Sequence, residues 1–369
     1  MRFLIINILF FSTILNAKYL DNHACNECHE KIYQEYQTSA HSKSFFNDEL
    51  HRKIANKVSS KKYDCAVCHM PAADNLHDLM IGKARPDKTN VTHTDAISCY
   101  FCHTIAYVKK AHKYNLIQKA RQADGFKPTL YGRLKNPEDS DKHSSLKSPI
   151  YGKMACTGCH AHKLNDRNTT IFQVMNDKED SLSCIKCHMP QLEGGVEKMD
   201  KRNRGHHISH KFLGIHDVEF RKKGIDINAS VQGTTLKVTL HNKMTHPLII
   251  QPARVKYLNI KVYRGSNLIW QNYKNLPQED KQGYFAYSFK QDGHVVVIPD
   301  NATQRFEYNL NAKETKILKY NIPDIHKGDK VEVSLYVKLA KDDCAKVVDL
   351  KDKSLIKSQL IKKISFIFN

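Results

Sequence analysis

No segment of this chain has the roughly 20 consecutive apolar residues that a membrane-spanning helix needs. The longest apolar run, from Phe3 to Leu15, has about 13 residues, follows Arg2 and precedes Asn16-Ala17. A basic residue, an apolar run and a small residue in this order are typical of a secretory signal, whereas the run is short for a retained membrane anchor. We therefore expect residues 1–17 to be a cleaved signal peptide and the mature protein to be soluble.

Acidic residues are also scarce, since 58 Lys and Arg stand against 38 Asp and Glu. The net charge of +20 includes +7 from residues 18–220 and +12 from residues 221–369. Basic surfaces commonly bind nucleic acid or anionic surfaces, but an exported protein does not meet nucleic acid. The interpretations left are a solvated lysine-rich surface, an acidic partner protein and peripheral contact with an anionic membrane.

Cysteine is nearly absent from the second part of the chain, where Cys344 stands alone and is expected to be a free, partly buried thiol. The other ten cysteines form five pairs with two residues between the members, and a histidine follows every pair. The pairs and their histidines are Cys25, Cys28 and His29; Cys65, Cys68 and His69; Cys99, Cys102 and His103; Cys156, Cys159 and His160; and Cys184, Cys187 and His188.

Cys-x-x-Cys-His is the attachment signature of c-type haem. Two intervening residues form one tight turn that brings both thiols to a single porphyrin, and the next residue then lies beneath the iron. A zinc site or a disulfide does not require histidine at that position, and all five motifs have it. The sequence therefore predicts five covalently bound haem c groups, held by the ten cysteines, with the five motif histidines as proximal iron ligands.

The distal ligands decide whether each iron is saturated, which suits electron transfer, or open to a substrate. The chain has 21 histidines, so 16 remain after the proximal ones. We expect the distal ligands among His41, His93, His143, His207 and His210, although each of these is also compatible with a surface or core histidine. A second rank comprises His23, His51, His77, His112, His162 and His216. In the C-terminal part, His241, His246, His294 and His326 are expected to be structural, with His246 able to reach across a domain interface.

These segments resemble the tetrahaem cytochrome c family that accepts electrons from hydroxylamine oxidoreductase, and the wider multihaem group around that oxidoreductase. The resemblance covers about residues 22–216 and implies a mostly helical fold with closely spaced haems, most of them bis-histidine ligated and one potentially five-coordinate. Pentahaem nitrite reductase is disfavoured, because its catalytic motif ends in lysine. The matching segments are Cys25-Asn-Glu-Cys28-His29 with Ser-Ala-His41-Ser, His93 to His103, His143 to His160, and Cys187-His188-Met189-Pro190 through His210. The segment from Asn242 to Arg254 resembles a strand motif found after haem domains in related cytochromes.

The predicted fold class is α+β with two domains. Residues 18–222 form a mostly helical, loop-rich pentahaem domain, and residues 223–369 form an all-β immunoglobulin-like sandwich. The sandwich is predicted from short strands every 10–15 residues, with alternating apolar residues in Leu236–Leu240 and Val331–Val337. Helices are expected over Glu27–Gln37, Glu49–Val58 and Asp95–Lys110, and loops over Arg133–Lys147 and Gly194–Arg204.

The leading functional hypothesis is a periplasmic carrier that passes electrons along five haems between a respiratory donor, such as a membrane quinol-oxidising protein, and a terminal reductase. The alternative is an oxidoreductase acting on a small nitrogen or sulfur compound at one five-coordinate haem. In a third interpretation the C-terminal domain docks the protein on a partner. The distinguishing feature is the coordination number of the irons.

Overall fold

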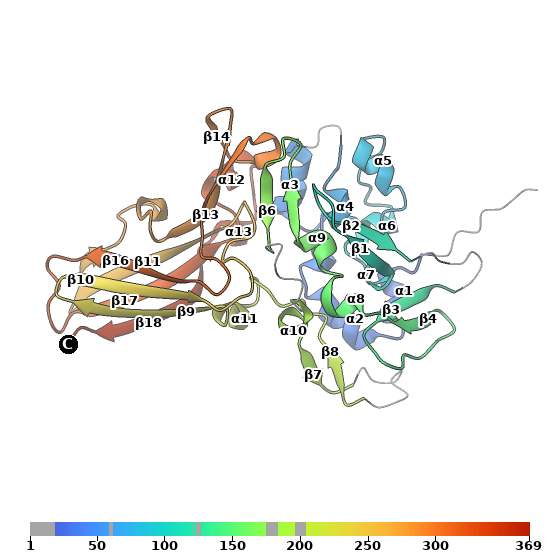
Figure 1. Cartoon of the computed structure of the whole chain (residues 1–369), viewed down its shortest axis with the longest axis horizontal. Helices are drawn as coiled ribbons and strands as arrows, with labels where there is room; N and C mark the ends of the chain where they lie inside the picture. Colours follow the sequence, from blue (N-terminus) through green and yellow to red (C-terminus); the bar gives the residue numbers. More distant parts are fainter. Residues whose placement is uncertain (1–18, 59–61, 121, 123–126, 175–183, 196–203) are drawn as a thin grey trace, which may run out of the picture.

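A computed structural model describes residues 19–58, 62–120, 122, 127–174, 184–195 and 204–369 of the chain. The expected signal peptide, residues 1–17, lies outside these residues. Residues 19–222 are called the motif domain below and residues 223–369 the β domain. The two lie end to end, and the C-terminus is at the end of the β domain that faces away from the motif domain (Figure 1).

The motif domain is built from short helices, the longest of which has 10 residues, and from two-stranded sheets. Helices this short are not stable by themselves, so packing must hold them in place. The helices are α1 (Asn22–Asn26), α2 (Glu30–Gln37), η1 (His41–Lys43), α3 (Glu49–Val58), α4 (Ala66–His69), α5 (Leu76–Ile81), α6 (Val91–Thr94), α7 (Cys99–His103), α8 (Ile150–Lys153), α9 (Thr157–His160), α10 (Cys184–His188) and α11 (Val218–Lys222).

Between these helices, the described part of the motif domain contains four pairs of strands. Three are antiparallel, and β3 with β4 is parallel. The pairs are β1 (Ile105–Lys109) with β2 (Leu116–Lys119), β3 (Thr129–Gly132) with β4 (Ser144–Lys147), β5 (His162–Leu164) with β6 (Thr170–Gln173), and β7 (Gln191–Glu193) with β8 (His206–Ile208).

The helix prediction for Glu49–Val58 is confirmed by α3, and that for Glu27–Gln37 is confirmed over Glu30–Gln37. The prediction of a helix over Asp95–Lys110 is confirmed only over α7 (Cys99–His103) and is wrong before and after it. At His103 α7 ends, and the side chains of Ile105 and Val108 become buried on strand β1. The predicted loop over Arg133–Lys147 ends in strand β4, and most of the predicted loop at 194–204 lies outside the described residues.

The β domain contains two antiparallel sheets that share one apolar core. The three-stranded sheet has the order β16-β10-β9, and the seven-stranded sheet has the order β14-β13-β11-β17-β18 with β12 beside β11 and β15 beside β13. The strands are β9 (Ile225–Gln232), β10 (Thr235–Asn242), β11 (Val255–Arg264), β12 (Asn267–Gln271), β13 (Tyr284–Gln291), β14 (His294–Val296), β15 (Gln304–Tyr308), β16 (Thr315–Asn321), β17 (Lys330–Lys338) and β18 (Gln359–Ile367).

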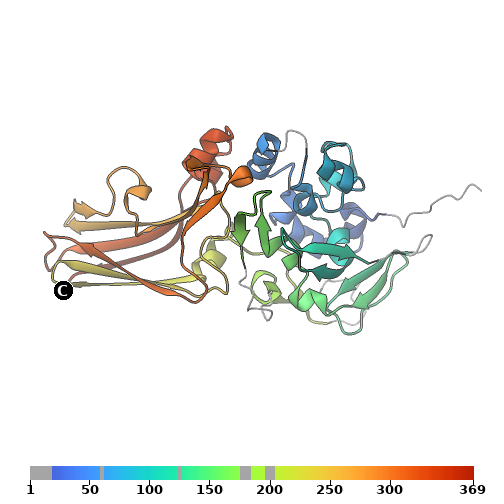
Figure 2. The same ribbon diagram turned by 45° about the horizontal axis from the view of Figure 1, so that its top comes forward.

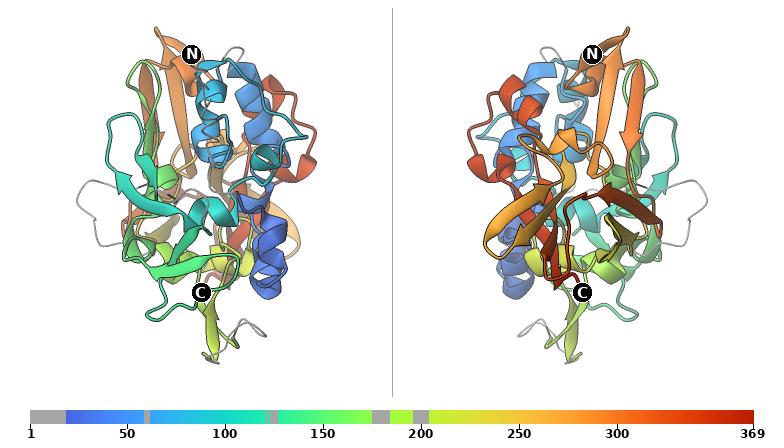
Figure 3. Two further views of the ribbon diagram at one scale, coloured as in Figure 1. Left: turned by 90° about the vertical axis from the view of Figure 1, so that its right-hand side faces the viewer. Right: turned by 90° about the vertical axis from the view of Figure 1, so that its left-hand side faces the viewer.

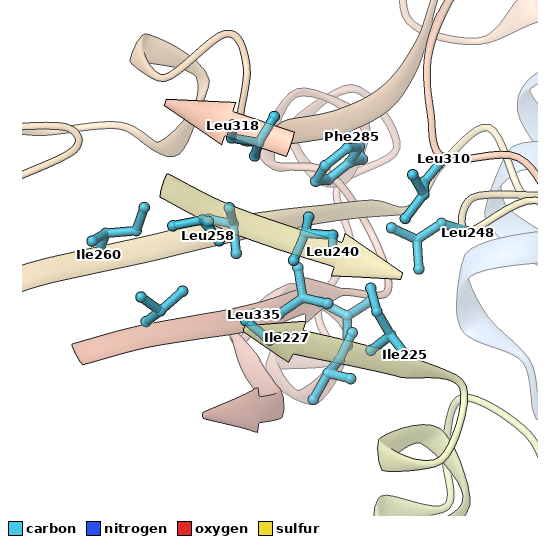
Figure 4. Packing of buried hydrophobic residues seen from close by; sticks show 14 of the residues in the cluster. Ile225, Ile227, Leu240, Leu248, Leu258, Ile260, Phe285, Leu310, Leu318 and Leu335 are labelled. Carbon is cyan, nitrogen blue, oxygen red and sulfur yellow. The ribbon is translucent and has the colours of Figure 1, made fainter. Parts of the chain in front are cut away.

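The alternation predicted from the sequence sets the inner faces of these sheets. Along β10, the side chains of Leu236, Val238 and Leu240 are fully buried, while the residues between them are partly exposed. Successive side chains of a strand point to opposite faces, so one face of β10 enters the core. Figure 4 shows Leu240 together with Ile227 of the same sheet and Leu258 and Leu335 of the other sheet.

The two domains contact each other through an apolar cluster and through side-chain bonds to the backbone. Leu50 and Ile54 of α3 pack against Cys344 and Val348, which lie in and just after α12 (Asp342–Val347). Figures 2 and 3 show α3 beside α12 and the short helix α13 (Lys353–Ile356). Cys344 is a free thiol with 2% of its surface exposed.

Polar contacts extend the same interface. The Glu49 carboxylate accepts hydrogen bonds from the backbone N–H groups of Lys351 (3.0 Å) and Asp352 (2.7 Å). On the other side, the Asn165 amide donates to the carbonyl oxygens of Pro299 (2.9 Å) and Ala302 (2.8 Å). These bonds join helix α3 and the β5–β6 hairpin of the motif domain to the β domain.

Candidate haem-binding sites

Each Cys-x-x-Cys-His motif lies at or beside a helix of one or two turns. The N–H group of the motif histidine donates to the carbonyl of the first cysteine, at 2.9 Å for each of His29, His69 and His160. This i to i+4 bond sets the first cysteine and the histidine one helical turn apart on the same side of the backbone. In α7 the turn is fixed further by Ser98, whose hydroxyl accepts from the N–H of Phe101 at 3.1 Å.

Every motif histidine faces a second histidine from a distant part of the chain. The pairs, with the distances between ring centroids, are His29 with His143 (6.2 Å), His69 with His51 (4.8 Å), His103 with His210 (6.3 Å), His160 with His41 (6.0 Å) and His188 with His246 (6.4 Å). The sequence separation within a pair ranges from 18 residues for His51 and His69 to 119 residues for His41 and His160.

Four of these five distances fit two imidazoles on opposite sides of one metal atom. A metal–imidazole bond is about 2 Å long, and the ring centre lies about 1 Å beyond the nitrogen, so two such ligands place their centroids about 6 Å apart. Four pairs have this spacing, and the pair of His51 and His69 is closer. The Nδ1 atom of His41 supports the same interpretation, because it is buried and has no hydrogen-bond partner among the described residues.

In the described part of the chain, four of the five histidines opposite the motifs, all except His41, have a hydrogen-bond contact at Nδ1. Nδ1 of His210 contacts the carbonyl of Ile208 at 2.8 Å, Nδ1 of His143 contacts the Ser145 hydroxyl at 3.1 Å, and Nδ1 of His51 contacts the Asp48 carboxylate at 2.5 Å. Such contacts fix the orientation and tautomer of a ring, leaving Nε2 free to bind a metal.

His246 belongs to the β domain, so the fifth pair spans the two domains. It lies in the loop after β10, and its Nδ1 atom contacts the carbonyl oxygen of Pro247 at 2.9 Å. The Asn242 amide, at the end of β10, holds this loop by donating to the carbonyl of His246 at 3.0 Å and to that of Leu310 at 3.1 Å. Asn242 itself is fully buried, which fixes the loop to the core of the β domain.

Burial keeps several of these rings neutral. It lowers the pKa of His41 and of His69 to about 3, and that of His210 and of His246 to about 4. Desolvation penalises the charged imidazolium, and a second histidine nearby adds to the effect. A neutral imidazole is the form that binds a metal, so these rings need not lose a proton first.

Two of the histidines that the sequence favoured as distal ligands lie elsewhere. Nδ1 of His93 accepts from the N–H of Asp87 at 3.0 Å, and its Nε2 contacts Asn75 at 2.7 Å. Nδ1 of His207 contacts the carbonyl of Gly194 at 2.7 Å, and its Nε2 contacts the Glu35 carboxylate at 3.0 Å. Both ring nitrogens of each are therefore used within the protein.

His51 and His246 take their places opposite motif histidines. His51 was in the second rank of candidates, and His246 was expected to be structural unless it crossed the interface. The sequence did contain a signal for His51: it lies on the predicted helix Glu49–Val58, three residues after Asp48. That spacing allows an acid at the helix start to orient the ring.

The motifs also lie next to one another. Cys25 and Cys99 lie close enough to shift the pKa of each other's thiol, and the same holds for Cys68 with Cys159 and for Cys156 with Cys184. The first motif is therefore beside the third, the second is beside the fourth, and the fourth is beside the fifth. Cys102 lies close enough to Cys156 to raise the pKa of its thiol, which joins the third motif to the fourth.

The five motifs are thus packed beside one another, and each motif histidine faces a second histidine. Residues 24–104 match the family described as cytochrome c554 and c-prime. The fold is similar to that of a penta-haem cytochrome c552 from Thermochromatium tepidum, with a TM-score of 0.74 and 22% identity over 95% of this chain and 99% of that one.

A second solved structure, the E. coli curli protein CsgC, matches 31% of this chain and 82% of its own length with 15% identity and a TM-score of 0.15. That similarity is too low to carry an argument. No curated protein matches the sequence. None of the helices in the described part of the chain is both long and apolar enough to cross a membrane.

Proposed function

We propose that this chain is an exported electron-transfer protein that binds five c-type haems, each with two histidine ligands. The observation that carries the proposal is the pairing of every motif histidine with a second histidine. In this proposal the distal ligands are His143, His51, His210, His41 and His246, in the order of the five motifs. His51 and His246 thus replace His93 and His207, whose ring nitrogens are already hydrogen-bonded.

A c-type haem supplies an iron that gains and loses one electron. The residues of this chain attach it through the cysteine pair, saturate it from both sides and exclude other ligands. The adjacency of the motif cysteines supports a continuous route from the first motif to the third, then to the fourth, with the second and fifth motifs both next to the fourth. The direction of flow follows from the potentials of the centres and from the partners.

A route of this kind needs a donor and an acceptor. A respiratory donor, such as a quinol-oxidising membrane protein, and a terminal reductase fit an exported, soluble carrier in the periplasm. The β domain supports the function in two ways that the contacts make concrete: it supplies His246, and it packs against α3, which carries His51. Removing residues 223–369 would therefore change haem ligation as well as docking.

The alternative, an oxidoreductase for a small nitrogen or sulfur compound, requires an open iron position. A pair of histidines at each motif leaves none, which favours the carrier. The test is electron paramagnetic resonance and optical spectroscopy of the oxidised holoprotein, with and without nitrite, hydroxylamine or sulfite, together with the ratio of haem to protein.

We expect five haems per chain, all low-spin and unchanged by the three compounds. A high-spin centre whose spectrum shifts with one of them would overturn the carrier proposal and name the substrate class. A haem-to-protein ratio below five would show that at least one motif carries no haem, and would overturn the assignment of a haem to each of the five motifs.

A further inference from the structure

The outer nitrogens of the proposed ligands have unequal partners. Nδ1 of His103 contacts the carbonyl of Tyr131 at 2.7 Å, Nδ1 of His188 contacts that of Leu213 at 2.5 Å, and His210 and His246 likewise face carbonyls. His69 and His143 face the hydroxyls of Ser44 and Ser145. All of these partners are neutral.

His51 differs from them, because its Nδ1 atom lies 2.5 Å from Oδ2 of the Asp48 carboxylate. No other proposed ligand has a hydrogen bond or ion pair to a carboxylate among those found in the described part of the chain. The other carboxylate oxygen of Asp48, Oδ1, accepts from the backbone N–H of His51 at 3.1 Å. One side chain thus caps helix α3 and orients the ring of His51.

An aspartate carboxylate is ionised at neutral pH, and both carboxylate oxygens of Asp48 contact His51. The charged groups that face it come from both domains: the rings of His51 and His69, and the side chains of Arg254 and His216. Arg254 is a cation and offsets part of the negative charge, but it makes no hydrogen bond to Asp48.

A carboxylate that accepts a hydrogen bond from the Nδ1–H group of a histidine gives the ring partial imidazolate character and makes Nε2 a stronger donor to a metal. A stronger, more negative ligand stabilises the oxidised iron over the reduced iron. We propose that Asp48 is a positioning residue that sets the reduction potential of the centre at Cys65, Cys68 and His69 below the value it would have with a neutral hydrogen-bond partner at Nδ1 of His51.

This inference rests on the proposed function, since it takes His51 to be an iron ligand. It gives the second centre a distinct role. That centre is next to the fourth through Cys68 and Cys159, outside the route from the first motif to the fifth. With a lowered reduction potential, the second centre would hold its electron less tightly than the fourth centre does. Electrons would therefore pass from the second centre to the fourth.

The test is potentiometric titration of the holoprotein, followed optically and by electron paramagnetic resonance, for the wild type and three variants. Asp48→Asn removes the charge but keeps an oxygen that can accept a hydrogen bond. Asp48→Ser keeps a helix cap but cannot reach the ring of His51. Glu49→Gln is the matched control, because it removes one negative charge from the adjacent residue, whose carboxylate bonds to the backbone of Lys351 and Asp352 and to no ligand.

In both Asp48 variants we expect one of the five reduction steps to move to higher potential, with a change in the g values of one low-spin signal. In Glu49→Gln we expect neither change. Equal titration curves for the three variants would overturn the inference and leave the carrier proposal intact. A shift of all five steps would also overturn it, since that reports a structural effect and not a local one. Failure of the carrier proposal shows separately, as a high-spin centre in the wild type.

Discussion

Replacing His246 by alanine is the sharpest perturbation of the proposed ligand set, because this histidine comes from the β domain while its partner His188 belongs to a motif. The ring centroids are 6.4 Å apart, and His246 is half-buried. Alanine cannot reach across that distance. The change should leave the fifth haem with one axial ligand and the other four with two.

The expected magnitude follows from the number of pairs. In the proposed ligation each of the five histidine pairs would hold one low-spin iron, so one pair would account for one fifth of the low-spin signal of the oxidised protein. In His246→Ala we expect one fifth of the low-spin intensity to be replaced by a high-spin signal. In His246→Met we expect the low-spin signal to persist and one reduction step to rise, because a thioether ligand favours the reduced iron.

The assay is quantitative electron paramagnetic resonance at equal haem concentration, with haem content checked first. His294→Ala is the matched control, since His294 is an exposed histidine of the same domain at the start of β14. It should leave all five low-spin signals in place. If His246→Ala kept the full low-spin intensity, without a substitute ligand appearing in the optical spectrum, the assignment of His246 as an iron ligand would be refuted.

Two further results are expected from chemical denaturation, which measures the free energy of unfolding. Leu50→Ala opens the apolar cluster between the domains, where Leu50 is 5% exposed, and should lower the free energy of unfolding by about 2–5 kcal/mol. Val347→Ala, on the exposed side of α12, should lower it by less than about 0.5 kcal/mol, and equal losses for the two variants would contradict the interface packing. Burial lowers the pKa of Lys256 from 10.5 to about 7, so between these values the unfolded chain binds a proton that the folded one does not, and stability rises with pH by up to about 1.4 kcal/mol per pH unit. Lys256→Met should abolish that rise between pH 7 and 10, and an unchanged slope would show that Lys256 is not its source.

Local spacing explains why the motif sites were accessible from the sequence. Two residues between the cysteines and histidine directly after them impose a single helical turn, and the N–H of His160 bonds to the carbonyl of Cys156 one turn earlier as this requires. The strand pattern of the β domain is equally local, because alternation at Leu236, Val238 and Leu240 needs only one buried face. Nothing further along the chain has to be known in either case.

Which histidine faces each motif histidine was decided by tertiary structure. His93 and His51 look alike in the sequence, since both lie in short helical segments near aspartate. Packing turns both nitrogens of His93 toward Asn75 and Asp87, while it turns only the outer nitrogen of His51 toward Asp48. Similarly, no sequence pattern around His246 predicts its contact with His188, which is 58 residues earlier. The helix expected beyond His103 fails for the same reason, because pairing with β2 makes Ile105–Lys109 a strand. The sequence by itself determined where the five motifs and the strands lie, since both depend on neighbours within a turn or a strand. Which histidine lies opposite each motif depended on tertiary packing, within the motif domain for four pairs and between the two domains for His188 with His246.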